Sequence, residues 1–252
     1  MSQKEEENTD KGYVYDQAFM QWANANQQSA QVIVPLVLSF WPAKSVVDFG
    51  CAMGDWLAVW AKHGLSITGV DGDYVDRDKL NIKKEYFIEG DLNKSQNLGT
   101  RFDLVQCLEV AEHIQPENAE KLIDTLTSHS DAILFSASPP GQGGENHINE
   151  RPYEYWRDLF AKHDYQLFDC IRHDIIEQTK IKTWYRYNTM FYVHKSQVYR
   201  LPPEVLKYKI ASSGPVPDLA PKYYKLRRMI VRCFPLILFN FLSRLIARIV
   251  KS

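Results

Sequence analysis

The sequence predicts an α/β fold in which a mostly parallel sheet of seven strands is covered by helices on both faces. From residue 45 onward, short apolar runs alternate with helical stretches, the pattern of repeated strand–helix–strand units. The runs are apolar on both faces, as expected for parallel strands buried between helices. The connection between the last two runs is too short for a crossover helix of usual length, so we expect an antiparallel edge strand.

The expected elements alternate along residues 45–193. Strands are predicted at Ser45–Phe49, Ser66–Val70, Tyr86–Glu89, Asp103–Leu108, Ala132–Ala137, Gln166–Arg172 and Trp184–Val193. Helices are predicted at Asp55–His63, Asp76–Ile82, Glu117–Ser128 and Pro152–Lys162. The stretch Pro139–Gly144 is rich in proline and glycine and is expected to be a loop.

Segments of different composition flank these elements. The start of the chain is polar and acidic, which predicts disorder. Tyr13–Phe40 has the apolar spacing of one or two helices, and we expect Pro35 to break them. A stretch with five prolines follows the last strand, and a basic, partly apolar segment ends the chain. The predicted division is a disordered start, a main domain, a proline-rich linker and a basic amphipathic tail at residues 1–12, 13–195, 196–221 and 222–252.

Charge is distributed unevenly along the chain. The net charge of all 252 residues is −1, yet no acidic residue follows Asp218, whereas eight lysines and arginines do. The chain up to Asp218 therefore carries 22 basic and 31 acidic residues, a net charge of −9. An acidic body argues against general binding to polyanions, so we expect no DNA partner. The composition, 45% apolar and 24% charged, is that of a globular protein.

Four cysteines are scattered through the chain without a CxxC pair. They are Cys51, Cys107, Cys170 and Cys233. This number is too small for a disulfide scaffold, and the spacing does not fit a zinc ribbon. The first residues lack the apolar segment of a secretion signal. We therefore expect free thiols and a cytoplasmic protein.

A glycine-rich turn follows the first predicted strand, within Val46–Trp56. Gly50 and Gly54 suit a turn that a ligand approaches closely, and the next helix points unpaired N–H groups into the same space. The spacing does not match a phosphate-binding P-loop. Asp71 and Asp91 come at the ends of the next two strands. Both acids are therefore expected at the carboxyl edge of the sheet, where open α/β sheets bind ligands.

The motifs DFGCAMGDW, GVDGDY, IEGDL and FDLVQCLEVAEHI occur in this order on successive predicted strands. Together they resemble the motifs of class I S-adenosylmethionine (SAM)-dependent methyltransferases over roughly residues 40–195, which implies a Rossmann-like, doubly wound sheet. The resemblance implies that Asp48 and the turn Gly50–Gly54, including Cys51, hold the methionine part of SAM. Ala52 departs from the family, because many members have glycine at this position.

The same resemblance assigns roles to residues on the following strands. Asp71, with Gly72 beside it, would bind the ribose hydroxyls of the cofactor. Asp91 would meet the adenine amino group, and Leu92 would pack nearby. Leu108 would line the space near the sulfonium, together with the glutamate that follows it.

Carboxylates and imidazoles gather after the fourth and fifth strands. Glu109, Glu112 and His113 lie at offsets 0, 3 and 4, which places them on one face of a helical turn. His147 follows in the glycine-rich loop. Two carboxylates and two imidazoles could bind Mg²⁺ or Mn²⁺. The ExxEH pattern resembles that of ubiquinone-biosynthesis O-methyltransferases and small-RNA 2′-O-methyltransferases, in which such residues and a later histidine bind a divalent ion.

A reading without metal stays open. Near-variants of ExxEH occur in class I methyltransferases that need no metal, and the glutamates would then be cap or wall residues. His147 or His113 would be the general base that accepts a hydroxyl proton, with Glu109 beside the reacting centre. In either case the expected reaction is an in-line displacement at the sulfonium methyl.

Two further groups of residues are candidates for the acceptor pocket. Tyr153, Tyr155 and Trp156 would form either an aromatic wall for a sugar or ring, or part of a helix core. Arg186 and Asn188 are expected on one face of the last strand, directed toward the pocket.

The expected reaction is O-methylation of a small-molecule, sugar or lipid-linked acceptor. RNA 2′-O-methylation is the alternative reaction, and a non-catalytic cofactor-binding partner protein is an alternative of another class. The longest charge-free stretch of the tail, Cys233–Ser243, is eleven residues and too short to span a bilayer. We expect the tail to lie on an anionic membrane surface, at the inner face of a membrane. Docking on its own domain or on a partner is the alternative.

Overall fold

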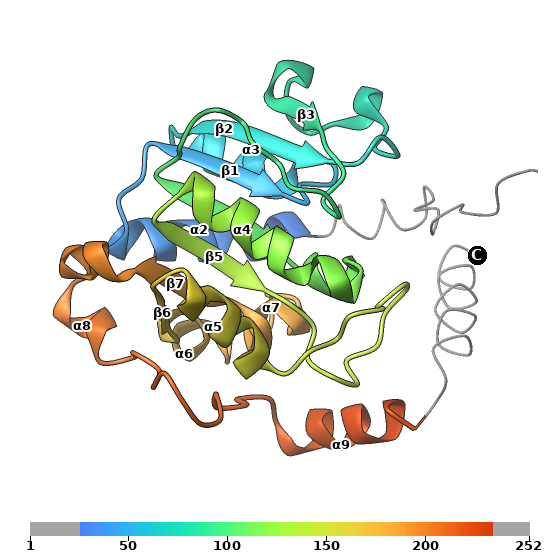
Figure 1. The fold of residues 1–252 in the computed structure, drawn as a ribbon, viewed down its shortest axis with the longest axis vertical. Helices are drawn as coiled ribbons and strands as arrows, with labels where there is room; N and C mark the ends of the chain where they lie inside the picture. Colours follow the sequence, from blue (N-terminus) through green and yellow to red (C-terminus); the bar gives the residue numbers. More distant parts are fainter. Residues whose placement is uncertain (1–25, 234–252) are drawn as a thin grey trace, which may run out of the picture.

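The computed structural model describes residues 26–233, and in this range seven strands form one sheet. The strand order is β3-β2-β1-β4-β5-β7-β6 (Figure 1). Their bounds are β1 Ser45–Phe49, β2 Ser66–Asp71, β3 Phe87–Glu89, β4 Leu104–Leu108, β5 Ala132–Ser136, β6 Tyr165–Phe168 and β7 Met190–His194. Strands β1 to β5 pair in parallel, and β7 runs antiparallel to both β5 and β6. The predicted mostly parallel sheet with an antiparallel strand near one edge is confirmed.

Helices cover both faces of this sheet, because alternate residues of the strands point to opposite sides. Val46 packs into the core under one layer and Val47 into the core under the other. The first layer contains α2 Gln27–Phe40, α3 Asp55–Lys62, α6 Cys170–Ile175 and α7 Thr183–Asn188. The second contains α4 Ala119–His129 and α5 Tyr153–Lys162, drawn in front of the sheet in Figure 1. The chain therefore forms a three-layer α/β sandwich.

Two helix predictions in the first half of the domain are wrong. Pro35 lies inside α2 rather than ending it. Both Pro35 and Gln31, the residue whose carbonyl loses its helical partner, lie on the exposed face, where solvent can reach that carbonyl. The helix predicted at Asp76–Ile82 is only a 3₁₀ turn, Arg77–Lys79, which the Asp76 side chain caps by accepting from the backbone N–H of Asp78. The first helices predicted in Tyr13–Phe40 lie partly outside the described residues.

The strands predicted at Gln166–Arg172 and Trp184–Val193 are each half helix. Strand β6 ends at Phe168 and α6 follows, while α7 precedes β7. Aromatic residues fit a helix here because they contact neighbours on different sides. Tyr185 packs edge-on against Trp56, with ring centroids 5.1 Å apart, and Tyr187 packs against Tyr224 at 5.4 Å. Arg186 and Asn188 therefore lie on a helix rather than on a strand face.

Residues 195–221 run along the domain with many contacts. They include the 3₁₀ helix Lys195–Arg200 and the short α8, Pro203–Leu206. Arg157 donates to the carbonyl of Gly214 at 2.6 Å, and Val216 is buried. This segment leads to α9, Lys222–Val231, which Figure 1 shows below the carboxyl-edge loops.

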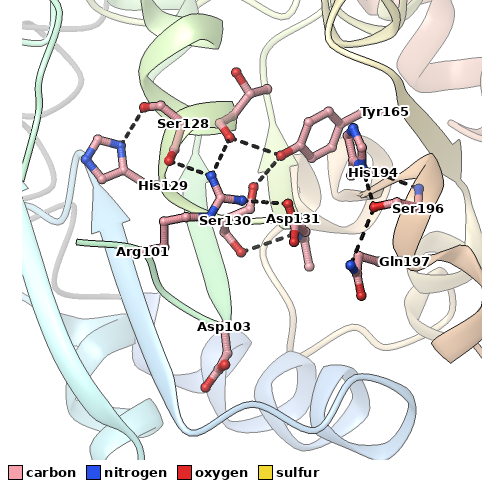
Figure 2. A network of polar contacts seen from close by, with 12 residues as sticks. Arg101, Asp103, Ser128, His129, Ser130, Asp131, Tyr165, His194, Ser196 and Gln197 are labelled. Carbon is pink, nitrogen blue, oxygen red and sulfur yellow. Dashed lines mark hydrogen bonds and ion pairs between the residues drawn. The ribbon is translucent and has the colours of Figure 1, made fainter. Parts of the chain in front are cut away.

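The amino edge of the sheet carries a polar network around Arg101 and Tyr165 (Figure 2). Arg101 donates to the carbonyl of Ser128 at 2.7 Å and pairs with Asp131 at 2.5 Å. The hydroxyl of Tyr165 donates to the carbonyls of Thr127, at 3.1 Å, and Ser130. These bonds join the starts of β5 and β6 to the end of α4 and fix that edge of the domain.

Candidate active site

A cleft of about 1260 Å³ opens at the carboxyl edge of the parallel strands. Loops after β1, β2, β3, β4 and β5 line it, together with α7 and α9. The location is that expected for a ligand site in an open α/β sheet. All the residues that the sequence assigned to cofactor, catalysis or metal lie at or next to this cleft. Those that line it are Asp48, Gly50, Cys51, Asp71, Gly72, Asp91, Leu92, Leu108, Glu109, Glu112, His113 and His147.

The turn after β1 has a backbone that requires glycine. Gly50 has φ of +89° and Gly54 has φ of +80°, both in the left-handed region. A Cβ on Gly50 would lie 2.2 Å from Cγ2 of Val110. Ala52 adopts φ of +47°, so its methyl is accommodated at a strained position. The turn brings backbone close to the cleft, and Gly54 directly precedes the first turn of α3.

Asp71 holds this turn against the end of β2. Its Oδ2 accepts from the backbone N–H of Ala52 at 2.7 Å, and its Oδ1 accepts from the backbone N–H of Gly72 at 2.7 Å. The hydroxyl of Tyr74 also donates to Oδ1. Burial raises the pKa of Asp71, and these three hydrogen bonds oppose the rise. The carboxylate therefore belongs to the same structural unit as the glycine turn.

Asp48 is a buried acid beneath the turn. Burial raises its pKa to about 8, although Gln106 donates to its Oδ2 at 2.8 Å. Trp60 in turn fixes Gln106 through a hydrogen bond of 2.9 Å from the indole N–H. A cation bound nearby would favour the ionised form of Asp48. The cationic ammonium of a methionine group is such a ligand.

Asp91 and Leu92 follow β3 at the far end of the cleft. The Asp91 side chain is about half exposed and pairs with Lys94 at 3.2 Å. Leu92 is 8% exposed and packs in the core under α4. A charged acceptor beside an apolar wall suits a flat polar ring such as adenine.

Glu109 follows β4 in a left-handed conformation, with φ of +55°. Its Oε1 accepts from the side-chain amide of Asn188 at 3.0 Å, and its Oε2 accepts from that of Gln142 at 2.9 Å. Asn188 also donates to Gln142 Oε1 at 2.9 Å and accepts from the Tyr153 hydroxyl at 2.9 Å. A buried network of neutral groups thus sets the direction of the Glu109 carboxylate.

Glu112 is fully buried next to this network. Ser138 donates to its Oε1 at 2.8 Å, but its Oε2 is buried with no hydrogen-bond partner among residues 26–233. Burial, and then the nearby charge of Glu109, raise the pKa of Glu112 well above its usual value. A buried carboxylate oxygen without a donor is costly, and a bound cation would remove the cost.

Glu112, His113 and His147 come together as a possible metal site. One ligand atom from each lies within 4.8 Å of the others. Nδ1 of His113 lies 3.2 Å from the carbonyl oxygen of Asn146, and Nδ1 of His147 lies 3.0 Å from Oε1 of Glu150. Such partners on Nδ1 direct Nε2 to be the ligand or the base. Glu109 is not a member of this three-residue cluster.

The two histidines have different electrostatic surroundings. Enclosure by the protein and the charge of His147 lower the pKa of His113 to about 3. His147 instead faces the Glu150 carboxylate, which also accepts from the backbone N–H groups of Gly141 and Gly143 at 2.6 and 2.7 Å. A proton accepted by His147 would therefore lie beside a carboxylate.

Several contributors to the site carry no motif in the sequence. Gln142, Ser138 and Glu150 lie in or next to the proline- and glycine-rich loop. Their polar side chains were the only feature of the sequence that could have indicated a role in the site. Trp156 and Phe160 are fully buried in the core, which is the second of the two readings left open for that helix. Tyr153 is also buried, and it reaches the site only through Asn188.

The C-terminal helix α9 completes the rim of the cleft through Tyr224, Arg227 and Val231. It docks on its own domain, because Arg228 is buried and paired with Asp218. Its apolar residues point outward and are more than half exposed: Tyr223, Leu226, Met229 and Ile230. Residues 234–252 lie outside the described range. No helix within residues 26–233 has the length and apolar character needed to cross a bilayer.

Comparisons with known proteins identify the family of the chain. The profile of a family described as a methyltransferase domain matches residues 20–174. The ubiquinone biosynthesis O-methyltransferase of Stutzerimonas stutzeri is 25% identical over 158 residues, which are 57% of this chain and 62% of that protein. The enzyme of the same name from Coxiella burnetii is 29% identical over 103 residues, 37% of this chain and 43% of that protein. The chain thus matches less than two thirds of these relatives' lengths.

Solved structures share the fold at low sequence identity. Magnesium protoporphyrin IX methyltransferase from Synechocystis, with bound SAM, has a TM-score of 0.51 and 19% identity, covering 73% of this chain and 86% of that one. A sugar N-methyltransferase from Streptoalloteichus has a TM-score of 0.56 and 15% identity, covering 77% of this chain and 98% of that one. Both similarities are limited to the fold, that is, to the arrangement of the sheet and its helices.

Proposed function

The chain belongs to the class I SAM-dependent methyltransferases, and from this we propose that it transfers a methyl group to an oxygen of a small-molecule, sugar or lipid-linked acceptor. The observation that carries the proposal is the cluster of Glu112, His113 and His147 at the cleft. These side chains can take up a hydroxyl proton or hold a cation that polarises the hydroxyl. The O-methyltransferase relatives support the choice of oxygen.

The cofactor would occupy the part of the cleft formed by the turn after β1 and the ends of β2 and β3. Asp48 and the turn Gly50–Gly54 would hold the methionine part, whose ammonium matches the buried acid. Asp71 would accept from the ribose hydroxyls with its remaining lone pairs, and Asp91 would accept from the adenine amino group. The methyl group would then point toward Leu108 and Glu109.

His147 would act as the base in the absence of metal. Its Nε2 takes the acceptor hydroxyl proton while the oxygen attacks the methyl carbon, and the carbon–sulfur bond breaks with its electron pair going to sulfur. The products are the methyl ether, S-adenosylhomocysteine and a protonated imidazole that Glu150 stabilises. The protein contributes alignment and charge balance, because the reaction is a single displacement.

The residues present also fit a divalent ion. Glu112 Oε2 and the two Nε2 atoms would supply one oxygen and two nitrogens. Nitrogen ligands suit Mn²⁺, Fe²⁺ or Zn²⁺ better than Mg²⁺. A bound ion would lower the pKa of an acceptor hydroxyl, and Glu150 and the Asn146 carbonyl would orient the imidazoles.

Calorimetry tests both parts of this proposal. S-adenosylhomocysteine should bind in EDTA, and Mn²⁺ should bind in a separate titration. His147→Gln should abolish Mn²⁺ binding and keep cofactor binding, while the matched control His173→Gln, at a half-exposed histidine outside the cleft, should keep both. Equal Mn²⁺ binding by the two variants would contradict the metal site, and absence of cofactor binding would contradict the pocket.

The RNA alternative is tested with the same protein. The ExxEH residues are also compatible with a ribose 2′-hydroxyl as acceptor. The net charge of −9 before residue 219 disfavours a polyanionic substrate. Methyl transfer to an RNA 3′ end at near-physiological salt would replace the small-acceptor proposal. Family membership favours an enzyme over a non-catalytic binding protein, and release of S-adenosylhomocysteine during turnover is the measurement that distinguishes them.

We propose that α9 also contacts an anionic membrane surface from the cytoplasmic side. Its outward residues Leu226, Met229 and Ile230 are 57%, 64% and 52% exposed, and the chain beyond Asp218 carries only positive charges. Changing Leu226 and Met229 together to serine should release the protein from anionic vesicles in sedimentation. Unchanged sedimentation would contradict this contact.

A further inference from the structure

Helix α9 contributes one face to the cleft. Tyr224, Arg227 and Val231 line it, and their spacing of i, i+3 and i+7 places them on a single helical stripe. Tyr224 packs against Tyr187 of α7 with ring centroids 5.4 Å apart. The cofactor part of the cleft lies against β1, β2 and β3. The α9 stripe therefore belongs to the acceptor part.

The position of this stripe is fixed by contacts on the other residues of the helix. Arg228 pairs with Asp218, and Lys225 donates to the carbonyl of Asp218 at 2.7 Å. A Cβ on Gly141 would lie 2.2 Å from the carbonyl oxygen of Arg228, so the loop after β5 and α9 are in close contact. Arg227 donates from Nη1 to the carbonyl of Gln142 at 2.8 Å. The Arg227 side chain is thus anchored at the rim by one of its nitrogens.

The charges of the cleft make Arg227 distinctive. Nine lining residues are acidic: Asp48, Asp55, Asp71, Asp73, Glu89, Asp91, Glu109, Glu112 and Glu145. Lys94 and Arg227 are the lysine and arginine that line it. Lys94 pairs with Asp91 at the β3 end, whereas in the described part of the chain no carboxylate forms an ion pair with Arg227. Among the described residues, the acceptor side therefore has one arginine or lysine, Arg227, that no acid of this range neutralises.

We propose that Arg227 binds an anionic group of the methyl acceptor, a carboxylate or a phosphate, with Tyr224 forming the wall beside it. An arginine matches either anion through paired N–H donors, and anchoring by Gln142 reduces the freedom that binding would cost. The charge of Arg227 also offsets the repulsion that the carboxylates of the cleft exert on an anionic acceptor. The inference rests on the proposed function and narrows its substrates to acidic acceptors.

Two matched pairs of probes test the proposal on the full chain loaded with S-adenosylhomocysteine and Mn²⁺. The first pair is 3,4-dihydroxybenzoate and catechol, and the second is glycerol 3-phosphate and glycerol. In at least one pair the acid should bind about tenfold tighter than its neutral partner, the effect of one charge-assisted contact. The pair that shows the preference identifies carboxylate or phosphate. Equal binding within both pairs, or no binding of any probe, would overturn the proposal.

Variants separate the charge of Arg227 from its role in holding the loop. Arg227→Gln should lose the preference for the acid, Arg227→Lys should keep part of it, and the exposed control Lys222→Gln should keep all of it. A lysine variant as defective as the glutamine variant would show that Arg227 acts by holding Gln142, which would overturn anion binding. Cofactor affinity is measured first for each protein. If the unmodified protein does not bind S-adenosylhomocysteine, the result contradicts the proposed function instead.

Discussion

At the amino edge of the sheet, Arg101 and Tyr165 bond to backbone carbonyls and to Asp131 (Figure 2), whereas at the carboxyl edge Glu112 keeps a buried oxygen with no partner among residues 26–233. Within residues 26–233, three non-glycine residues with left-handed backbone lie at the carboxyl edge, Ala52, Glu109 and Asn146, against Asp164 at the amino edge. Both edges belong to the same strands. The difference indicates that the amino edge serves stability and that the carboxyl edge gives up stability for ligands.

The largest expected effect comes from breaking the network that directs Glu109. Asn188→Asp removes both amide donors and adds a carboxylate beside Glu109, so we expect a loss of about 2–4 kcal/mol in unfolding free energy. Turnover should fall by about 100-fold, because Glu109 can rotate. Denaturant unfolding and S-adenosylhomocysteine release measure the two effects. Tyr165→Phe at the amino edge should cost about 1–2 kcal/mol and spare turnover of the folded enzyme; equal turnover in both variants would contradict the division between edges.

The cofactor half of the carboxyl edge is tested by Asp71→Ala. The change removes the acceptor for the N–H groups of Ala52 and Gly72 as well as the proposed ribose contact. Affinity for S-adenosylhomocysteine should fall about 100-fold in calorimetry, the loss of two hydrogen bonds to a charged group. Asp131→Ala, the amino-edge control, should bind as the unmodified protein does. Unchanged affinity of Asp71→Ala would mean that the ribose lies elsewhere.

The cost of the buried Glu112 carboxylate should depend on pH. Its pKa in the folded protein lies above that in the unfolded chain, so the folded state loses stability as pH rises above the ordinary glutamate value. Between pH 5 and pH 8 in EDTA, the unmodified protein should lose about 1–3 kcal/mol relative to Glu112→Gln. Urea unfolding at the two pH values measures this. Glu120→Gln, at an exposed glutamate whose pKa the ion pair with Lys162 lowers, should show no such loss. If the difference in unfolding free energy between the unmodified protein and Glu112→Gln is the same at pH 5 and pH 8, the raised pKa of Glu112 is contradicted.

The smallest effect is expected at the amino edge. Arg101 and Asp131 form a partly exposed ion pair, with side chains 50% and 40% exposed. Arg101→Gln should therefore lower the unfolding free energy by less than about 1 kcal/mol. Raising the salt concentration should reduce the difference further. A cofactor affinity that changes with this variant would show that the two edges are coupled.

Local patterns were sufficient to predict the first five strands and the fact that the residues assigned to the cofactor lie at or next to one cleft. The first five strands are short apolar runs, and a glycine or an acid directly follows each of the first four. The glutamates and histidines could also be identified from the sequence, because Glu109, Glu112 and His113 share one helical turn. In these regions the candidate functional residues directly follow, in the sequence, the strand that positions them.

The rest depends on contacts between distant segments. Asn188 bonds to Glu109 across 79 positions, and nothing near Asn188 in the sequence indicates it. The aromatic residues of α7 are compatible with a strand as well as a helix when only the local sequence is considered. The helix brings them into contact with Trp56 and Tyr224, which are distant in the sequence. The orientation of α9 depends on the ion pair between Arg228 and Asp218, and no local pattern in the sequence indicates this pair.

Helix α9 is distant in the sequence from the strands that carry the cofactor motifs. The ten residues Lys222–Val231 contribute to the acceptor rim but to none of the strands that carry the cofactor motifs. Under the proposed function, replacing the residues of α9 that line the cleft would alter acceptor preference and leave the cofactor-binding residues unchanged. Under the proposed function, substrate range can therefore be changed in α9 while the cofactor-binding strands stay as they are.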